Sequence, residues 1–139
     1  DARERGEALA HAGDGVELIG EVNDQAKQDF LANAAALIFP INWPEPFGLV
    51  MIEAMACGTP VIAFPCGSVP EVVEHGVTGY VVQSEADAVS ATKCLDKLDR
   101  KRVREGFERR FTARQMAEQY LRHYQRLCST VSMRVPQAT

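Results

Sequence analysis

Two glutamates eight residues apart, Glu45 and Glu53, are the side chains best suited to bind a polar ligand. Glu53 is the only charged residue between Gly48 and Cys57, in a segment expected to be an apolar helix. A carboxylate buried in such a helix is costly unless it is paired. Residues 28–92 contain no lysine or arginine, so we expect Glu53 to have no basic partner within the chain and to bind a ligand instead.

The start of the same helix suits an anion. Pro46 and Gly48 favour a first helical turn and a close approach to its backbone, and free N–H groups at a helix N-terminus bind phosphate. Glu45 lies just outside this N-terminus, and Glu53 lies roughly 8–9 Å along the axis, at about 1.5 Å per residue. Two carboxylates flanking an anion site could hold hydroxyls at both ends of a ligand with phosphates in its middle. A nucleotide sugar has that layout.

Apolar runs alternate with helical periodicity along the chain. We expect strands near 16–20, 35–39, 60–64 and 80–82, helices near 23–33, 48–57 and 69–74, and helical structure from 84 onward. Strands that are apolar throughout indicate burial on both faces, in a parallel sheet with helices on either side. This is the Rossmann-like α/β class, in which ligands bind at the carboxyl edge of the sheet.

Caps and breakers predict where these helices begin and end. We expect Asn23 or Asp24 to cap the first helix, Ser68 to cap the third, and Gly58 to follow the C-terminus of the second. A Ser68 nucleophile is disfavoured because no G-x-S-x-G elbow is present. The last helix is expected from Thr112 to about residue 131, with an apolar stripe of Met116, Tyr120, Tyr124, Leu127 and Val131.

Charge and cysteine content exclude several classes of function. Residues 1–92 carry a charge of −11 and residues 93–139 a charge of +7. Such a split is found in membrane- and nucleic-acid-binding chains, but solvated helices with one sign in excess are commoner. The acidic part would need basic residues from outside the chain to hold an anion. Four cysteines without C-x-x-C spacing predict reduced thiols in a cytosolic protein and no zinc site.

The segment EPFGLVMIEAMACGTP, residues 45–60, closely resembles the E-x7-E donor-binding motif of the retaining group 1 glycosyltransferases of GT-B fold. Residues 18–22 and 70–80 resemble the flanking segments of that family, and the resemblance covers roughly residues 14–83. It implies the C-terminal half of a GT-B fold, truncated at its N-terminal side. Residues 1–131 would form a partial nucleotide-sugar-binding domain, followed by a disordered tail at 132–139.

The resemblance also implies roles for individual residues. The Glu45 carboxylate would contact the donor hexose near the reacting centre, and Glu53 would hold the ribose hydroxyls. Backbone amides would bind the remainder of the donor: those of Phe47 and Gly48 the hexose, and those of Leu49 and Val50 the phosphates. No metal or cofactor is implied, since the nucleotide sugar is a substrate. An arginine and a lysine that neutralise the pyrophosphate in the family have no counterpart here, and Ser68 stands where the family often has a second glycine.

The function implied is transfer of a hexose from a nucleotide diphosphate sugar to an acceptor hydroxyl, with retention at the anomeric carbon. The resemblance predicts an enzyme that needs an N-terminal acceptor domain, without which the chain is inactive, and the cysteine content predicts a cytoplasmic location. No nucleic-acid partner is expected, and contact with a membrane surface is one use of the basic third. The alternatives are a nucleotide-sugar epimerase of the same fold and a non-catalytic nucleotide-binding domain.

Overall fold

The computed structural model describes residues 15–132, so the expected tail at 132–139 lies outside the described residues except for Ser132. A parallel sheet in the order β1-β2-β3 forms its centre, built from β1 (Leu37–Phe39), β2 (Val61–Ala63) and β3 (Gly79–Val81). Leu37 lies opposite Val61, which lies opposite Gly79. The three strands therefore end at one edge, as the sequence predicts.

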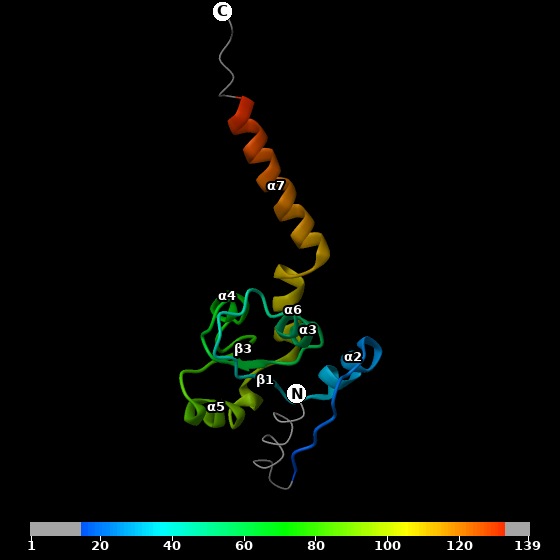
Figure 1. The fold of residues 1–139 in the computed structure, drawn as a ribbon, viewed down its shortest axis with the longest axis vertical. Coiled ribbons are helices and arrows are strands. Elements are labelled where there is room, and N and C mark those ends of the chain that lie inside the picture. The colour runs from blue at the N-terminus through cyan, green and yellow to red at the C-terminus, as the bar shows by residue number, and fades with distance from the viewer. Residues whose placement is uncertain (1–14, 133–139) are drawn as a thin grey trace, which may run out of the picture.

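Helices cover both faces of this sheet. Figure 1 shows α3, α4 and α6 on one side, α5 on the other, and α7 projecting away from the body. The Rossmann-like α/β class is thus confirmed. The helices are α2 (Asp24–Asn33), α3 (Leu49–Ala56), α4 (Val69–Val72), α5 (Glu85–Thr92), α6 (Arg100–Arg110) and α7 (Ala113–Ser132), with a 3-10 turn, η1 (Leu95–Lys97).

The larger core lies between the sheet and α3, α4 and α6. Met51, Met55 and Val103 are fully buried in it, together with Val61 and Ala63 of β2. A smaller cluster lies on the α5 side. Burial of β1 on both faces, which its sequence predicts, is wrong: Ile38 is 54% exposed. β1 is an edge strand, and α5 packs against the central strand β2.

The strand expected at 16–20 is also wrong, because these residues form no strand. Val16, Leu18 and Ile19 are all about half exposed, at 59%, 48% and 46%. A strand needs a neighbour for its backbone hydrogen bonds, and within residues 15–132 none pairs with this segment.

The predicted helix ends are mostly confirmed. Asn23 Oδ1 accepts a hydrogen bond from the Ala26 amide at 2.9 Å, and Thr112 Oγ1 accepts one from the Gln115 amide at 3.2 Å. Gly58 follows the end of α3, as expected. Ser68 occupies the N-cap position of α4, as expected, but its side chain makes no capping hydrogen bond and its backbone is helical, whereas a capping residue typically has an extended one.

Arginines of α6 hold the C-terminal ends of three helices. Helix C-termini present carbonyl oxygens with no partner in the helix and a partial negative charge, which guanidinium groups satisfy. The hydrogen bonds run from Arg100 to the carbonyls of Ala32 in α2 and of Ala34 just after it, from Arg104 to Ala56 of α3, and from Arg110 to Glu71 and Val72 of α4.

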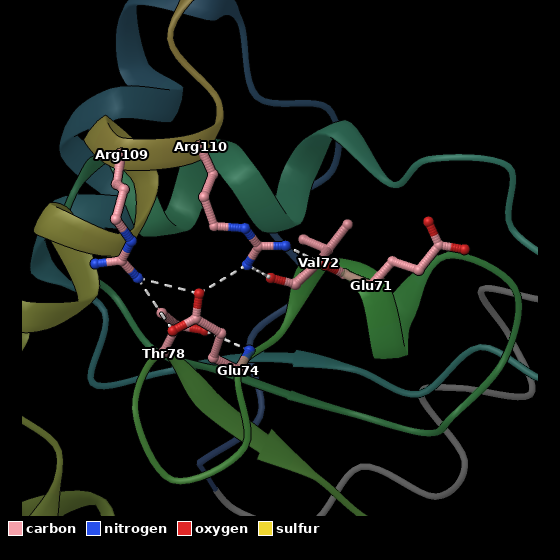
Figure 2. Close-up of polar contacts among 6 residues, drawn as sticks. All are labelled: Glu71, Val72, Glu74, Thr78, Arg109 and Arg110. Carbon is pink, nitrogen blue, oxygen red and sulfur yellow. Dashed lines mark hydrogen bonds and ion pairs between the residues drawn. The ribbon is translucent and has the colours of Figure 1, made fainter. Parts of the chain in front are cut away.

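Figure 2 shows how α6 also binds the turn before β3. Glu74 accepts hydrogen bonds from Arg109 and Arg110, each at 3.1 Å, and its amide donates to the buried Thr78 hydroxyl at 2.9 Å. The positive charge of the C-terminal third is therefore partly used inside the fold. No helix in the described part of the chain is long and apolar enough to cross a membrane.

Candidate functional site

The loops that leave β1 and β2 meet at the carboxyl edge of the sheet. The Ser68 amide donates to the Glu45 carbonyl at 2.9 Å. Gly67 has a φ of +55°, and a Cβ there would lie 2.3 Å from the Glu45 carbonyl oxygen. Only glycine allows both this backbone conformation and this approach. The 67–68 turn therefore supports the backbone of Glu45.

The Glu45 carboxylate is held on both of its oxygens. The Gly48 amide donates to Oε1 at 3.1 Å, and Trp43 Nε1 donates to Oε2 at 3.2 Å. Gly48 caps α3 with a φ of +72°, which turns the chain from the loop into the helix. Sequence reasoning missed Trp43, although an indole N–H two residues from a carboxylate is a usable signal.

The predicted backbone donors at the start of α3 divide into two groups. The Gly48 amide is taken by Glu45. The amides of Phe47, Leu49 and Val50 donate to no group in the described chain, so they are available to a ligand. The Phe47 and Leu49 side chains beside them are 43% and 63% exposed.

A cavity of about 410 Å³ opens beside Glu45. The Ser68 hydroxyl oxygen is buried next to it and has no hydrogen-bond partner among the described residues. The lining residues come from the loop after β1, the turn after β2, α4 and the end of α6: Pro44, Glu45, Pro46, Phe47, Gly67, Ser68, Glu71, Val72 and Phe111.

Glu53 departs from two expectations. It is neither buried nor unpaired: its side chain is 36% exposed, and Lys27 Nζ lies 2.8 Å from Oε1. The partner comes from α2, just before the run of residues without lysine or arginine, and α2 packs against α3. Asp24 lies 3.2 Å from the same ammonium group. Hydrogen bonding to Glu53, and secondly to Asp24, raises the pKa of Lys27 above its ordinary value.

A second cavity, of about 470 Å³, lies beside this ion pair. Glu45 does not line it, so the structure places the two glutamates in separate cavities at α3. Its lining comes from α2, α3 and α6, with Cys57 after α3: Asp24, Lys27, Gln28, Leu31, Glu53, Ala56, Cys57 and Arg104. Within residues 15–132, no group of three or more His, Cys, Asp or Glu side chains could hold a metal ion.

A helix N-terminus with free amides, at the carboxyl edge of a parallel sheet, is the place where Rossmann-like domains bind their ligands. Residues 3–118 match the family described as "Glycosyl transferases group 1". The chain therefore belongs to the group 1 glycosyltransferases.

Relatives and solved structures agree with this assignment. The chain is 35% identical over 105 residues to N-acetyl-alpha-D-glucosaminyl L-malate synthase of Bacillus anthracis, and 40% identical over 78 residues to D-inositol 3-phosphate glycosyltransferase of Streptomyces scabiei. Sucrose-phosphate synthase of Thermosynechococcus elongatus has the same fold over 93% of this chain, with a TM-score of 0.75 and 31% identity. HepE of Anabaena, solved in complex with UDP, matches 89% with a TM-score of 0.74 and 25% identity.

The matches cover only part of each relative. The two curated relatives match over 68% and 56% of this chain, which is 28% and 17% of their own length. The two solved structures are covered over 35% and 36% of theirs.

Proposed function

We propose that this chain is the donor-binding part of a hexosyltransferase and binds a nucleotide diphosphate sugar. The observation that carries the proposal is the start of α3, where the amides of Leu49 and Val50 are free and a glutamate stands on either side. Free amides at a helix N-terminus suit a diphosphate. UDP in the HepE structure, a neighbour of the same fold, supports a nucleotide ligand.

In the proposed reaction, the bond between the anomeric carbon and the diphosphate breaks while the oxygen of an acceptor hydroxyl bonds to that carbon, with retention. The hydroxyl proton passes to the leaving diphosphate. The leaving diphosphate gains charge, and the amides of Leu49 and Val50 stabilise it. Glu45, with its carboxylate already fixed, binds hydroxyls of the hexose. Glu53 binds the ribose. The nucleotide sugar is a substrate, and the scheme uses no further cofactor.

The ribose role is tested by Glu53→Ala in the full-length protein. Nucleotide affinity, measured by calorimetry with UDP and GDP, should fall about 10-fold or more, since a ligand hydroxyl loses a charged acceptor. Glu105→Ala on the exposed face of α6 is the matched control and should leave affinity unchanged. Unchanged affinity in the Glu53 variant would remove the ribose role.

The role of Glu45 is tested by Glu45→Gln, which keeps the side-chain shape. Turnover of the nucleotide sugar should fall by about 100-fold or more, while UDP and GDP binding changes by less than about threefold. Equal losses in turnover and binding would instead make Glu45 a support for the loop.

Transfer is separated from epimerisation by the products. A full-length transferase releases nucleotide from a nucleotide diphosphate hexose. An epimerase of this fold yields a sugar of changed configuration. The family assignment supports transfer. We propose that the 139-residue chain alone binds nucleotide without turnover, because GT-B chemistry needs an acceptor domain. We place the enzyme in the cytoplasm, with contact to a membrane surface through α7 as a testable addition.

A further inference from the structure

Lys27 is the only lysine or arginine between positions 15 and 92, and it lies against the glutamate proposed to bind ribose. Its ammonium group is 2.8 Å from Glu53 Oε1 and 3.2 Å from Asp24 Oδ1. It lines the 470 Å³ cavity with both carboxylates. The one lysine of this acidic stretch therefore lies at the Glu53 cavity.

Local structure fixes where this cation can be. Asn23 caps α2, and the Lys27 amide donates to the Asn23 carbonyl at 2.8 Å, so Lys27 lies in the first turns of that helix. Asp24 lies one turn earlier on the same face and holds the ammonium from its own helix. Glu53 holds it from α3. The ammonium group bridges two helices.

The ion pair uses only one side of the Glu53 carboxylate. Lys27 donates to Oε1, and no residue in the described chain donates to Oε2. The side chain is 36% exposed and faces the cavity. A carboxylate whose one oxygen is fixed and whose other is open is oriented to accept from a hydroxyl pair.

We propose that Lys27 is a positioning residue that orients Glu53 toward the ribose hydroxyls and so sets the preference for ribonucleotides over 2′-deoxyribonucleotides. The inference rests on the proposed function. A mere strut between α2 and α3 would affect both nucleotides alike. A direct contact from the ammonium to a phosphate would also weaken both alike, because the phosphates are identical.

The test uses the full-length protein and four probes: UDP, GDP and the 2′-deoxy form of each, titrated by calorimetry. Wild type should prefer the ribonucleotide by about 10-fold or more, for whichever base it binds. Lys27→Met should reduce this preference to below about threefold, and Lys27→Arg should retain most of it. Lys101→Met, an exposed lysine of α6, is the control and should match wild type.

A double variant sharpens the result. If Lys27 acts through Glu53, Lys27→Met should have no further effect on the ribonucleotide preference in a Glu53→Gln background. An equal loss of ribo- and deoxyribonucleotide affinity in Lys27→Met, or losses that add in the double variant, would overturn the inference while leaving the proposed function intact. Failure of the wild-type protein to bind any of the four nucleotides would overturn both.

Discussion

At the scale of single residues, the two motif glutamates are held in different ways. Donors from the same short loop, Trp43 and Gly48, fix both oxygens of Glu45. A donor from another helix, Lys27, fixes one oxygen of Glu53. The orientation of Glu45 is therefore a property of the loop after β1, whereas that of Glu53 depends on how α2 packs against α3. Substitutions can separate these two dependencies.

Trp43→Phe removes the donor to Glu45 Oε2 and keeps an aromatic ring. We expect turnover to fall about 3- to 30-fold, because the carboxylate loses one of two charge-assisted hydrogen bonds, with nucleotide affinity unchanged. Steady-state kinetics and calorimetry on the full-length protein measure the two effects. Tyr80→Phe removes a comparable aromatic donor, to the Cys94 carbonyl, away from Glu45, and should leave turnover unchanged. A wild-type rate for Trp43→Phe would show that the Gly48 amide alone is enough to orient the Glu45 carboxylate.

The Lys27 ion pair predicts a pH dependence of stability. Its pKa is raised by Glu53 and then Asp24, so the folded state binds the proton more tightly than the unfolded chain. The stabilisation is complete below the ordinary pKa of 10.5 and is lost as pH rises through the higher folded value.

Urea unfolding of wild type and Lys27→Met should therefore give a stability difference that is constant from about pH 7 to about pH 10 and shrinks above that. A difference that vanished between pH 7 and 9 would contradict this account.

At the scale of elements, α6 connects three separate helix ends. Its arginines satisfy carbonyls of α2, α3 and α4, and Figure 2 shows one of these contacts beside the Glu74 pair. Because α3 carries the candidate site at its other end, α6 holds the site without touching its amides. This use of positive charge could not be inferred from composition, since the arginines bind main-chain oxygens.

Arg100 offers the clearest test of this arrangement. It donates to two carbonyls at the C-terminal end of α2 and to the Thr59 hydroxyl. Arg100→Met should lower the free energy of unfolding by about 1.5–3 kcal/mol, as expected for hydrogen bonds to a charged group. Arg102→Met, in the same helix and exposed, should change it by less than about 0.5 kcal/mol. Equal losses of stability in the two variants would show that the positive charge of α6, and not capping of α2, stabilises the fold.

The turn after β2 gives an element-scale prediction for the site. Gly67→Ala places a Cβ 2.3 Å from the Glu45 carbonyl oxygen, at a φ of +55°, so the loop that carries Glu45 must shift. We expect turnover to fall about 100-fold, since small displacements of catalytic groups are costly. Gly76→Ala has a similar φ of +77° but open space around it, so it should cost about 1 kcal/mol of stability and leave turnover intact.

The elements show what the sequence could and could not predict. The parallel α/β class, β2 burial and the ends of α2 and α3 follow from local patterns, because apolar runs and capping residues act over a few positions. The segment 16–20 and the outer face of β1 could not be predicted locally, because strand pairing and burial depend on neighbours distant in the chain. The ion pair of Lys27 with Glu53 could not be predicted for the same reason, because an ion pair between two helices has no fixed spacing in the sequence.

At the scale of the whole molecule, the division of charge has a structural use. The basic third satisfies helix ends and Glu74 from α6, and the acidic part keeps a single lysine beside Glu53. Within the described chain, no lysine or arginine lines the Glu45 cavity at the start of α3. A diphosphate there would be bound by amides, with any further positive charge supplied by the rest of the enzyme.

Helix α7 exposes most of its apolar stripe. Met116, Tyr120 and Tyr124 are 57%, 57% and 58% exposed, and Leu127 is 62% exposed; the side chain of Val131 lies outside the described part. A contiguous exposed apolar stripe favours an interaction surface. We expect it to pack against the acceptor domain in the full-length protein.

The same substitution in two chain lengths tests this expectation. Tyr120→Ser with Tyr124→Ser should lower the Tm of the full-length protein by several degrees, at about 2–4 °C per kcal/mol, and leave that of the 139-residue chain unchanged, because the two rings are already exposed there. Gln125→Ser, on the exposed helix, is the control. If the stripe instead binds a bilayer, Tm stays constant at both lengths, while co-sedimentation with anionic vesicles is lost in the double variant and weakened by salt in wild type.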